Sequence, residues 1–182
     1  MTNRKLHITE LERLSQQEFQ SAVKTPLVIV LDNVRSLHNV GSVFRSSDAF
    51  LAEAVYLCGI TSVPPHPEIH KTALGAEDSV EWRYFEDTIT AVDDLKAKGY
   101  IVYAVEQAEG SIPLNYLRRG DADRIAVVLG HEVKGVQQAV IDRCDGSIEI
   151  PQFGTKHSLN VSVAGGIVIW ELFKLLNHGL ER

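Results

Sequence analysis

Short, continuous apolar runs recur along the chain and alternate with segments of helical periodicity. The runs lie at residues 27–32 (LVIVLD), 54–58, 100–105, 124–130 and 147–150, with a more polar run at 80–85. A continuous apolar run of strand length is typical of a strand buried on both faces of a parallel sheet. Helical patterns lie at residues 9–24, 39–49, 67–74, 87–98, 136–144 and from 158 onward. The alternation predicts an α/β fold with an open, mostly parallel sheet and helices on both faces.

The first helical pattern rests on two capping boxes and an apolar stripe. Thr9 precedes Glu12, and Ser15 precedes Glu18, at the spacing by which side chains cap a helix N-terminus. The stripe is made of Leu11, Leu14, Phe19 and Val23. One helix over residues 9–24 is therefore expected.

Length and composition indicate one ordinary globular domain. The 182 residues, 45% of them hydrophobic, suffice for a single core, so we expect one domain at 1–182, with an N-terminal helical extension at 1–25 before a core at 26–178. No N-terminal apolar region resembles a signal peptide, and no stretch reaches membrane-spanning length, which predicts a cytoplasmic protein without a membrane partner. Cys58 and Cys144 form no CxxC, so neither a disulfide nor a cysteine-bound metal is expected.

The net charge of −6 counts against a nucleic-acid partner, because phosphate binding uses clustered Lys and Arg. Basic residues do gather locally, at Arg35, His38 and Arg45, at His70 and Lys71, at Arg118 and Arg119, and at Lys156 and His157. Such groups are either solvated faces or local phosphate contacts. An acidic body with basic loops remains compatible with RNA.

Two predicted strand ends carry candidate functional residues. After the first run, Asn39 can cap a helix, Gly41 permits close backbone approach and Arg45 projects from that helix, either as a surface ion-pair partner or as a functional cation. After the run at 124–130, Glu132 stands in a turn bounded by Gly130 and Gly135. Neither GxxxxGK[ST] nor GxGxxG follows a strand, so the common nucleotide-binding fingerprints are missing.

A third candidate segment runs from the last predicted strand into the last helix. A loop with Gly154, Lys156 and His157 leads to a helix expected to start near Ser158. Ser158 and Asn160 are either plain helix caps or groups that meet a ligand at the helix N-terminus. The pair Gly165-Gly166 within the helix predicts close packing, since each glycine costs about 1 kcal/mol relative to Ala in a helix interior.

Together these segments resemble the three motifs of the SpoU family of RNA 2′-O-ribose methyltransferases, within the SPOUT superfamily. The matching residues are Asn39-Val40-Gly41 with Arg45, then Leu129-Gly130-His131-Glu132 with Gly135, then Ile150-Pro151 with Gly154 and SLNVSVA at 158–164. They stand in the family's order and spacing over residues 27–176, and HKTALGAEDSV from His70 is similar to the family's stretch between the first two motifs. The chain looks closest to the TrmH-like tRNA enzymes.

The resemblance implies a sheet whose C-terminal part is threaded into a deep trefoil knot, and a homodimer with active sites near the subunit interface. It also implies that S-adenosylmethionine binds the knot loops, mainly through backbone groups near Val105, Glu106, Leu129, Gly130, Ile150 and Leu159. The nearly all-apolar last helix fits a dimer interface. Gln152 departs from the family pattern, since many relatives have Met there.

The resemblance further makes Arg45 the catalytic residue, with Asn39, Glu132, Ser158 and Asn160 in the remaining active-site positions. A guanidinium with a pKa above about 12 is a poor base. We therefore hypothesise that Arg45 binds the neighbouring RNA phosphate and stabilises the developing alkoxide, and that the phosphate or a transiently neutral Arg45 takes the proton. Asn39 is expected to orient Arg45 or the ribose.

Other functions remain open at this stage. The substrate is expected to be tRNA, with rRNA as the second candidate, and a non-catalytic RNA-binding or assembly module is a different class of function. His66 and His70 could suggest a metal hydrolase, but HPEIH is not HExxH and Pro67 stands where a helix could only begin, so no metal is expected.

Overall fold

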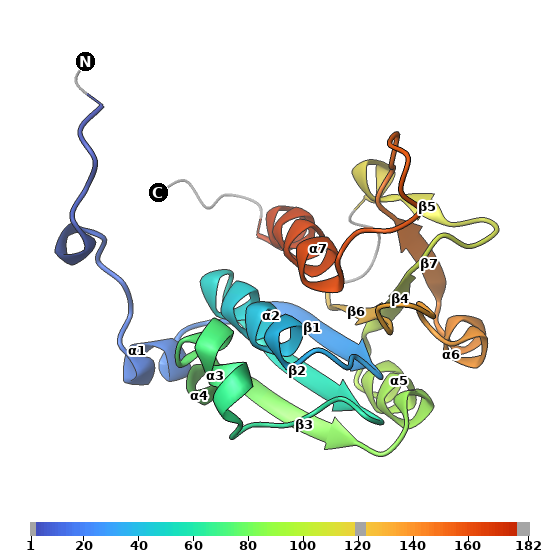
Figure 1. The fold of residues 1–182 in the computed structure, drawn as a ribbon, viewed down its shortest axis with the longest axis horizontal. Coiled ribbons are helices and arrows are strands. Elements are labelled where there is room, and N and C mark those ends of the chain that lie inside the picture. The colour runs from blue at the N-terminus through green and yellow to red at the C-terminus, as the bar shows by residue number, and fades with distance from the viewer. Residues whose placement is uncertain (1–2, 119–122, 178–182) are drawn as a thin grey trace.

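The computed structural model describes residues 3–118 and 123–177 and shows a parallel sheet between two layers of helices (Figure 1). The strands are β1 (Thr25–Asp32), β2 (Ala52–Cys58), β3 (Glu81–Phe85), β4 (Ile101–Val105), β5 (Ile112–Pro113), β6 (Ile125–Leu129) and β7 (Gly146–Glu149). Their order across the seven-stranded sheet is β3-β2-β1-β6-β4-β7-β5. Every pairing of neighbouring strands is parallel. The predicted α/β sheet is confirmed.

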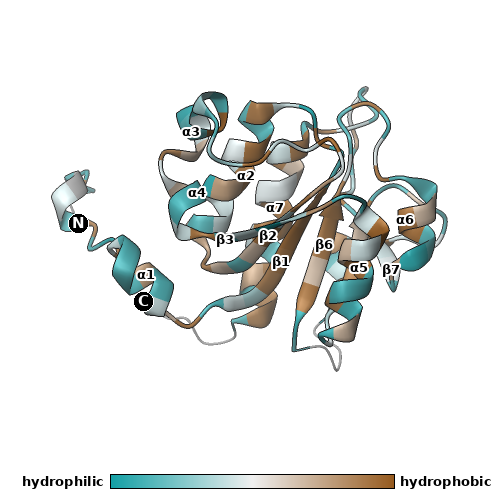
Figure 2. Cartoon of the chain, turned by 90° about the horizontal axis from the view of Figure 1, so that it is seen from below, coloured by the Kyte–Doolittle hydropathy of each residue, from teal (hydrophilic) through white to brown (hydrophobic). Residues whose placement is uncertain are grey.

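Alternate residues of the central strand β1 point into different cores. Leu27, Ile29 and Leu31 belong to the core under α2 (Leu37–Ala49), α3 (Pro67–Ala73), α4 (Ala76–Ser79) and α7 (Val161–Leu176). Val28 and Val30 belong to the core under α5 (Thr88–Ala97) and α6 (Gln138–Arg143). Figure 2 shows the apolar strands between these two layers. Burial on both faces explains why the strands read as continuous apolar runs.

The N-terminal segment differs from the single helix expected at residues 9–24. The structure has a 3-10 turn η1 (Ile8–Glu10) and a short helix α1 (Gln16–Ser21), and the chain before α1 extends away from the sheet (Figure 1). Glu12 has a left-handed φ of 44°, which ends helical geometry between them. The capping box of Ser15 and Glu18 forms. The apolar stripe does not, because Leu14 and Val23 are exposed and only Phe19 of the stripe is buried.

Two helix starts are also shifted from their expected positions. Ser36, rather than Asn39, is the N-cap of α2, and its Oγ accepts the Asn39 N–H at 3.3 Å. Asn160, rather than Ser158, is the N-cap of α7. Both shifts matter for the site, because they free the Asn39 side chain and fix that of Asn160.

Gly165 allows α7 to pack closely on the sheet and on α2. A Cβ atom at this position would lie 3.0 Å from Leu129 Cδ1 and 3.5 Å from Val43 Cγ2. A Cβ at Gly166 would make only an ordinary contact, 3.8 Å from Ser46 Oγ. The predicted close packing is therefore confirmed at Gly165, and α2 and α7 lie side by side on one face of the sheet (Figure 1).

Two further features concern the chain as a whole. Within residues 3–118 and 123–177, no helix is long and apolar enough to cross a membrane.

Residues 150–160 carry the chain from β7, near one sheet edge, back to α7, which packs over the central strands β1 and β6. Strand order does not define how a chain is threaded, so the trefoil knot stays a prediction.

Candidate functional site

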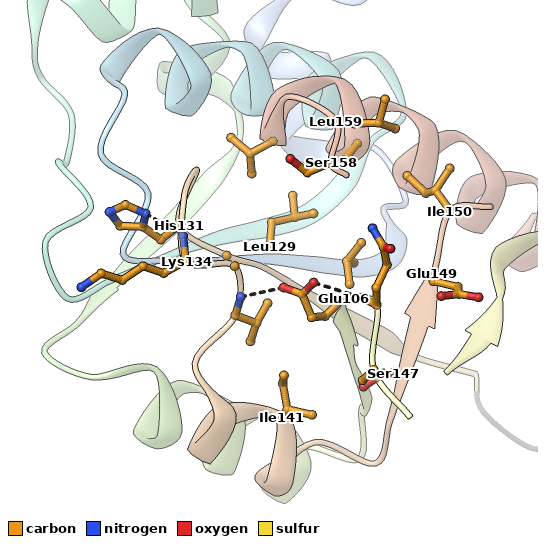
Figure 3. A pocket seen from close by; sticks show the side chains of 18 of the residues that line it. Glu106, Leu129, His131, Lys134, Ile141, Ser147, Glu149, Ile150, Ser158 and Leu159 are labelled. Carbon is orange, nitrogen blue, oxygen red and sulfur yellow. Dashed lines mark hydrogen bonds between the residues drawn. The ribbon is translucent and has the colours of Figure 1, made fainter. Parts of the chain in front are cut away.

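A cavity of about 860 Å³ opens beyond the carboxyl ends of β4, β6 and β7. Its walls come from the segment after β4 (105–109), the loop from β6 to α6 (129–136) and the segment from β7 into α7 (147–164), as Figure 3 shows in part. Ligands of open α/β sheets gather at this edge of the sheet. All the residues expected at the cofactor line the cavity: Val105, Glu106, Leu129, Gly130, Ile150 and Leu159.

Glu132 holds the start of α2 against the β6–α6 loop. Its Oε1 accepts the Ser36 backbone N–H at 2.8 Å and the Asn39 amide at 3.1 Å, and its Oε2 accepts the Arg35 N–H at 3.1 Å. Three donors on one carboxylate at a helix N-terminus stabilise its negative charge. Burial alone would raise the pKa of Glu132, but these hydrogen bonds outweigh it and hold the pKa below that of an ordinary glutamate. Glu132 is therefore an anion at neutral pH.

Asn160 extends the same network to α7. Its Oδ1 accepts the N–H groups of Ser162 at 2.9 Å and Val163 at 3.4 Å, while its Nδ2 donates to Asn39 Oδ1 at 3.2 Å. The path Glu132–Asn39–Asn160 joins residues from three predicted motifs that are 93 and 121 positions apart in sequence. Asn39, at the centre of this path, is buried, whereas Glu132 is half-buried and Asn160 is exposed.

The other two expected catalytic residues lie outside this network. Ser158 lines the cavity but is exposed, and the described structure assigns its side chain no hydrogen bond. Arg45 is exposed on α2, does not line the cavity, and has no ion pair within the described residues. The structure therefore unites Asn39, Glu132 and Asn160 and leaves Arg45 apart from them.

The β6–α6 loop forms a tight turn that only small residues allow. His131 and Gly135 exchange both backbone hydrogen bonds, at 2.8 and 3.1 Å. A Cβ atom on Gly130 would lie 2.2 Å from backbone atoms of Gly135 and Val136, which is a clash. Gly130 therefore lets this backbone close into the wall of the cavity.

Glu106 supports the same loop through its side chain, a role the sequence did not predict. Its carboxylate accepts the Val136 N–H at 3.0 Å and the Gln107 N–H at 3.0 Å (Figure 3). Next to it, Gln107 Nε2 donates to the His157 carbonyl at 2.7 Å and thus reaches the β7–α7 segment. The signal in sequence is a Glu-Gln pair at the carboxyl end of an apolar strand.

Asp32 anchors the base of the β6–α6 loop and was likewise missed. This fully buried carboxylate accepts from Thr88 Oγ1 at 2.6 Å, from Gln137 N at 3.1 Å and from Gln137 Nε2 at 2.9 Å. It therefore ties the end of β1 to α5 and to the start of α6. A charged residue ending a fully apolar strand could have indicated it, since buried carboxylates require partners.

The cavity suits S-adenosylmethionine in size and chemistry. Small-molecule pockets commonly measure about 300–1,000 Å³ and combine apolar walls with a few polar groups. Leu129, Ile150 and Leu159 offer apolar contacts for an adenine, whereas Glu106 and Glu149 add negative charge to the lining. That charge favours a ligand with a sulfonium and an ammonium group.

Metal-ligand chemistry is not indicated among the described residues. Within residues 3–118 and 123–177, no group of three or more His, Cys, Asp or Glu side chains is placed to hold a metal ion. Burial raises the pKa of Cys58 and of Cys144 to about 12. Both thiols are therefore protonated at neutral pH, whereas metals bind the thiolate.

Comparison with known proteins agrees with this geometry. Residues 26–170 match the family model described as the SpoU rRNA Methylase family. A relative from Nitrosomonas europaea, named 23S rRNA (guanosine-2'-O-)-methyltransferase RlmB, is 33% identical over 92% of this chain. The chain spans 64% of that relative's length.

Solved structures of similar fold include an AdoMet-bound rRNA methyltransferase from Sinorhizobium meliloti. The likeness has a TM-score of 0.78 at 24% identity and covers 87% of this chain and 60% of that one. A structure described as giving insights into the 2-OH methylation of C/U34 on tRNA has a TM-score of 0.71 at 24% identity, over 82% of this chain and 95% of that one. The family uses S-adenosylmethionine. The sequence motifs, the fold and these matches together show that the chain belongs to the SpoU family of RNA methyltransferases.

Proposed function

We propose that this chain transfers a methyl group from S-adenosylmethionine to a ribose 2′-hydroxyl in structured RNA. The observation that carries the proposal is the hydrogen-bonded path Glu132–Asn39–Asn160, which joins three motifs beside a cavity of suitable size. The name of the 33%-identical relative specifies guanosine 2′-O-methylation, which supports the ribose rather than a base as the acceptor.

The cofactor would be held by Val105, Glu106, Leu129, Gly130, Ile150 and Leu159, mainly through their backbone groups. Bound there, S-adenosylmethionine supplies a methyl group that is already activated by its positive sulfur. The chain must then align the ribose oxygen with that carbon and allow the hydroxyl proton to leave.

Glu132 does not act as the general base in this proposal. A base for this step works best with a pKa near the operating pH, but hydrogen bonds hold the pKa of Glu132 below the ordinary range. Glu132 instead fixes the start of α2 and the Asn39 side chain. Arg45 on the same helix would bind the RNA phosphate beside the target ribose and stabilise the developing alkoxide, and that phosphate or a transiently neutral Arg45 would accept the proton.

A homodimer would bring Arg45 to a cavity. Val163, Ile167 and Trp170 form an exposed apolar stripe on α7, at the spacing that places them on one helix face. Arg45 is exposed on α2, the helix that packs beside α7, and its neighbour in sequence, Ser46, lies near Gly166 of α7. If two copies pack through the stripe, Arg45 of one protomer can serve the cavity of its partner, which explains why it does not line its own.

Mixed dimers test this arrangement. Arg45→Ala and Gly130→Ala protomers, each inactive alone, should regain part of the wild-type rate when co-expressed, because one site of the mixed dimer is intact. No recovery in verified mixed dimers would place Arg45 at the cavity of its own protomer.

tRNA is the substrate proposed first, with rRNA second. Support for tRNA comes from the solved structure concerned with tRNA position 34, whose chain is matched over 95% of its length. Support for rRNA comes from the name of the Nitrosomonas relative. The two are separated by transfer of labelled methyl to unmodified total tRNA and, in parallel, to unmodified rRNA. A non-catalytic RNA-binding module would bind RNA and label neither.

A further inference from the structure

The segment between β7 and α7 is exposed along its whole length. Every residue from 151 to 160 is exposed. Within the described hydrogen bonds, residues 151–159 are held at one point, the His157 carbonyl that accepts from Gln107. Its ends are fixed by β7 and by the Asn160 cap of α7. The segment thus presents its side chains to a molecule that approaches the cavity from outside.

Phe153 is the most exposed of the large apolar side chains in the described residues, at 97%. It follows Gln152, which lines the cavity. On the facing β6–α6 loop, Val133 lines the cavity and is 85% exposed. One exposed apolar side chain needs no explanation, but two on the loops that border one cavity indicate a contact surface.

Basic residues stand near this apolar pair on both loops. Lys156 and His157 follow Phe153, and His131 and Lys134 stand on either side of Val133. Figure 3 shows His131 and Lys134 projecting outward from the β6–α6 loop. Neither Lys134 nor Lys156 has an ion pair within residues 3–118 and 123–177, so both charges are available to phosphates, although the chain has a net charge of −6.

We propose that Phe153 stacks on a base of the RNA next to the reacting ribose, with Lys134 and Lys156 on the adjoining phosphates. This rests on the proposed function and deepens it, because it names a residue that positions the substrate. Unpaired bases stack on aromatic side chains while cations follow the backbone, and this is how single-stranded RNA is held. A second copy of the chain is the alternative occupant, but the contact proposed for it is the exposed apolar stripe of α7 and not these loops.

The test compares Phe153→Ala, Phe153→Leu and Phe153→Trp, with Ile60→Ala as the matched control. Ile60 is also an exposed apolar residue, but it follows β2 and belongs to neither of the two loops that border the cavity. Binding of unmodified tRNA and of a short single-stranded oligoribonucleotide is measured by fluorescence anisotropy, and binding of S-adenosylmethionine by calorimetry.

Stacking predicts that Phe153→Ala raises the Kd for RNA by about 5- to 100-fold and leaves the Kd for S-adenosylmethionine unchanged. Phe153→Trp should restore RNA binding, Phe153→Leu should not, and Ile60→Ala should match wild type. Lys134→Ala and Lys156→Ala should each weaken RNA binding and reduce its salt dependence.

Unchanged RNA binding in Phe153→Ala, or full binding in Phe153→Leu, would overturn the stacking role. A changed oligomeric mass in Phe153→Ala would assign the surface to a second copy instead. The outcome is separable from the proposed function, because RNA binding is measured without methyl transfer. If RNA binds through Phe153 but is never methylated, the proposed enzyme activity is refuted and the role of Phe153 stands. If RNA is methylated normally and its binding does not depend on Phe153, the role of Phe153 is refuted and the enzyme activity stands.

Discussion

At the scale of single residues, Glu132 joins the β6–α6 loop to the start of α2. Its two oxygens hold the backbone of α2 and the Asn39 amide, so its charge and its shape both matter. Removing one member of such a hydrogen-bond network costs more stability than an average hydrogen bond contributes. The donors or acceptors that remain are left without a partner and are not fully solvated by water. Substitution of Glu132 is therefore expected to lower both the stability of the fold and the rate of methyl transfer.

Glu132→Gln should lower the free energy of unfolding by about 1–3 kcal/mol near neutral pH and should also lower the methyl-transfer rate. Glutamine keeps the size but replaces one acceptor oxygen with a donor that faces N–H groups. Urea denaturation of both proteins measures the first effect. Glu10→Gln, at an exposed carboxylate remote from the cavity, is the control and should leave the rate unchanged.

The effect of Glu132→Gln on stability should depend on pH. The pKa of Glu132 is lowered in the folded protein, so its contribution is present above the pKa of the unfolded chain, about 4.3, and is lost as the pH falls through the lower folded pKa. The difference in unfolding free energy between wild type and Glu132→Gln should therefore shrink in acid. A difference that grows in acid would contradict the assigned charge state.

Arg45→Lys should reduce turnover by about 100-fold or more while the Kd for S-adenosylmethionine stays unchanged. Lysine keeps the positive charge but loses the planar pair of donors that fits a phosphate. Single-turnover kinetics and calorimetry measure the two quantities. Near-normal turnover would remove Arg45 from the proposed chemistry.

The sequence predicted some residues of the site and missed the side-chain roles of others. Asn39, Glu132 and Asn160 could be found because they stand in motifs with fixed spacing, and the structure brings their side chains together. The side-chain roles of Glu106, Gln107 and Asp32 were missed, because each depends on a contact with a residue more than 25 positions away. Such contacts follow from the order of strands in the sheet, which local patterns do not give.

At the scale of elements, the site depends on two loops that close over the ends of parallel strands. The backbone of the β6–α6 loop must fold back closely on itself at Gly130, whereas Gly154 in the other loop stands in open space, with nothing within 4 Å of a Cβ atom. Alanine substitutions at Gly130 and Gly154 therefore form a matched pair of variants, because only the first adds a methyl group that would meet other atoms.

Gly130→Ala should abolish measurable binding of S-adenosylmethionine, because the new methyl group would meet the backbone of Gly135 and Val136 at 2.2 Å. Gly154→Ala should bind the cofactor like wild type. Calorimetry with each variant, after circular dichroism shows that both are folded, measures this. Equal cofactor binding by the two variants would exclude the β6–α6 loop as part of the cofactor site.

The strands were predicted more accurately than the helix boundaries. Burial on both faces makes β1, β2, β4 and β6 continuous apolar runs, whereas β5 has only Ile112 and Pro113 and gives no pattern to detect. The predicted N-terminal helix was wrong because local capping signals there have no buried face to support them. The start of α7 was placed too early because Ser158 and Asn160 are both good caps.

At the scale of the whole molecule, the proposed active site is built from two copies of the chain. The apolar stripe of α7 is exposed in one copy, and a homodimer through it remains a proposal, as does the trefoil knot. Neither follows from the order of strands, because that order describes one chain and not its threading or its partner.

Ile167→Glu should convert the protein to a monomer, because each copy would place a charge in an apolar contact. Light scattering coupled to gel filtration should give half the wild-type mass, with methyl transfer lost and the fold retained. Ile89→Glu, at an exposed isoleucine of α5 on the opposite face of the sheet, is the matched control and should stay dimeric. If the Ile167→Glu monomer is active, Arg45 of one protomer does not complete the active site of its partner.

Methylation of a ribose 2′-oxygen can be measured by alkaline hydrolysis of RNA labelled from S-adenosylmethionine. Alkali cleaves RNA through a free 2′-hydroxyl, so a 2′-O-methyl group protects the bond that follows it. The label is expected in alkali-resistant dinucleotides from tRNA or rRNA, and it should be absent when Arg45→Ala replaces the wild type. Label in mononucleotides would show base methylation, and no label in either RNA with the cofactor bound would contradict the proposed enzyme activity.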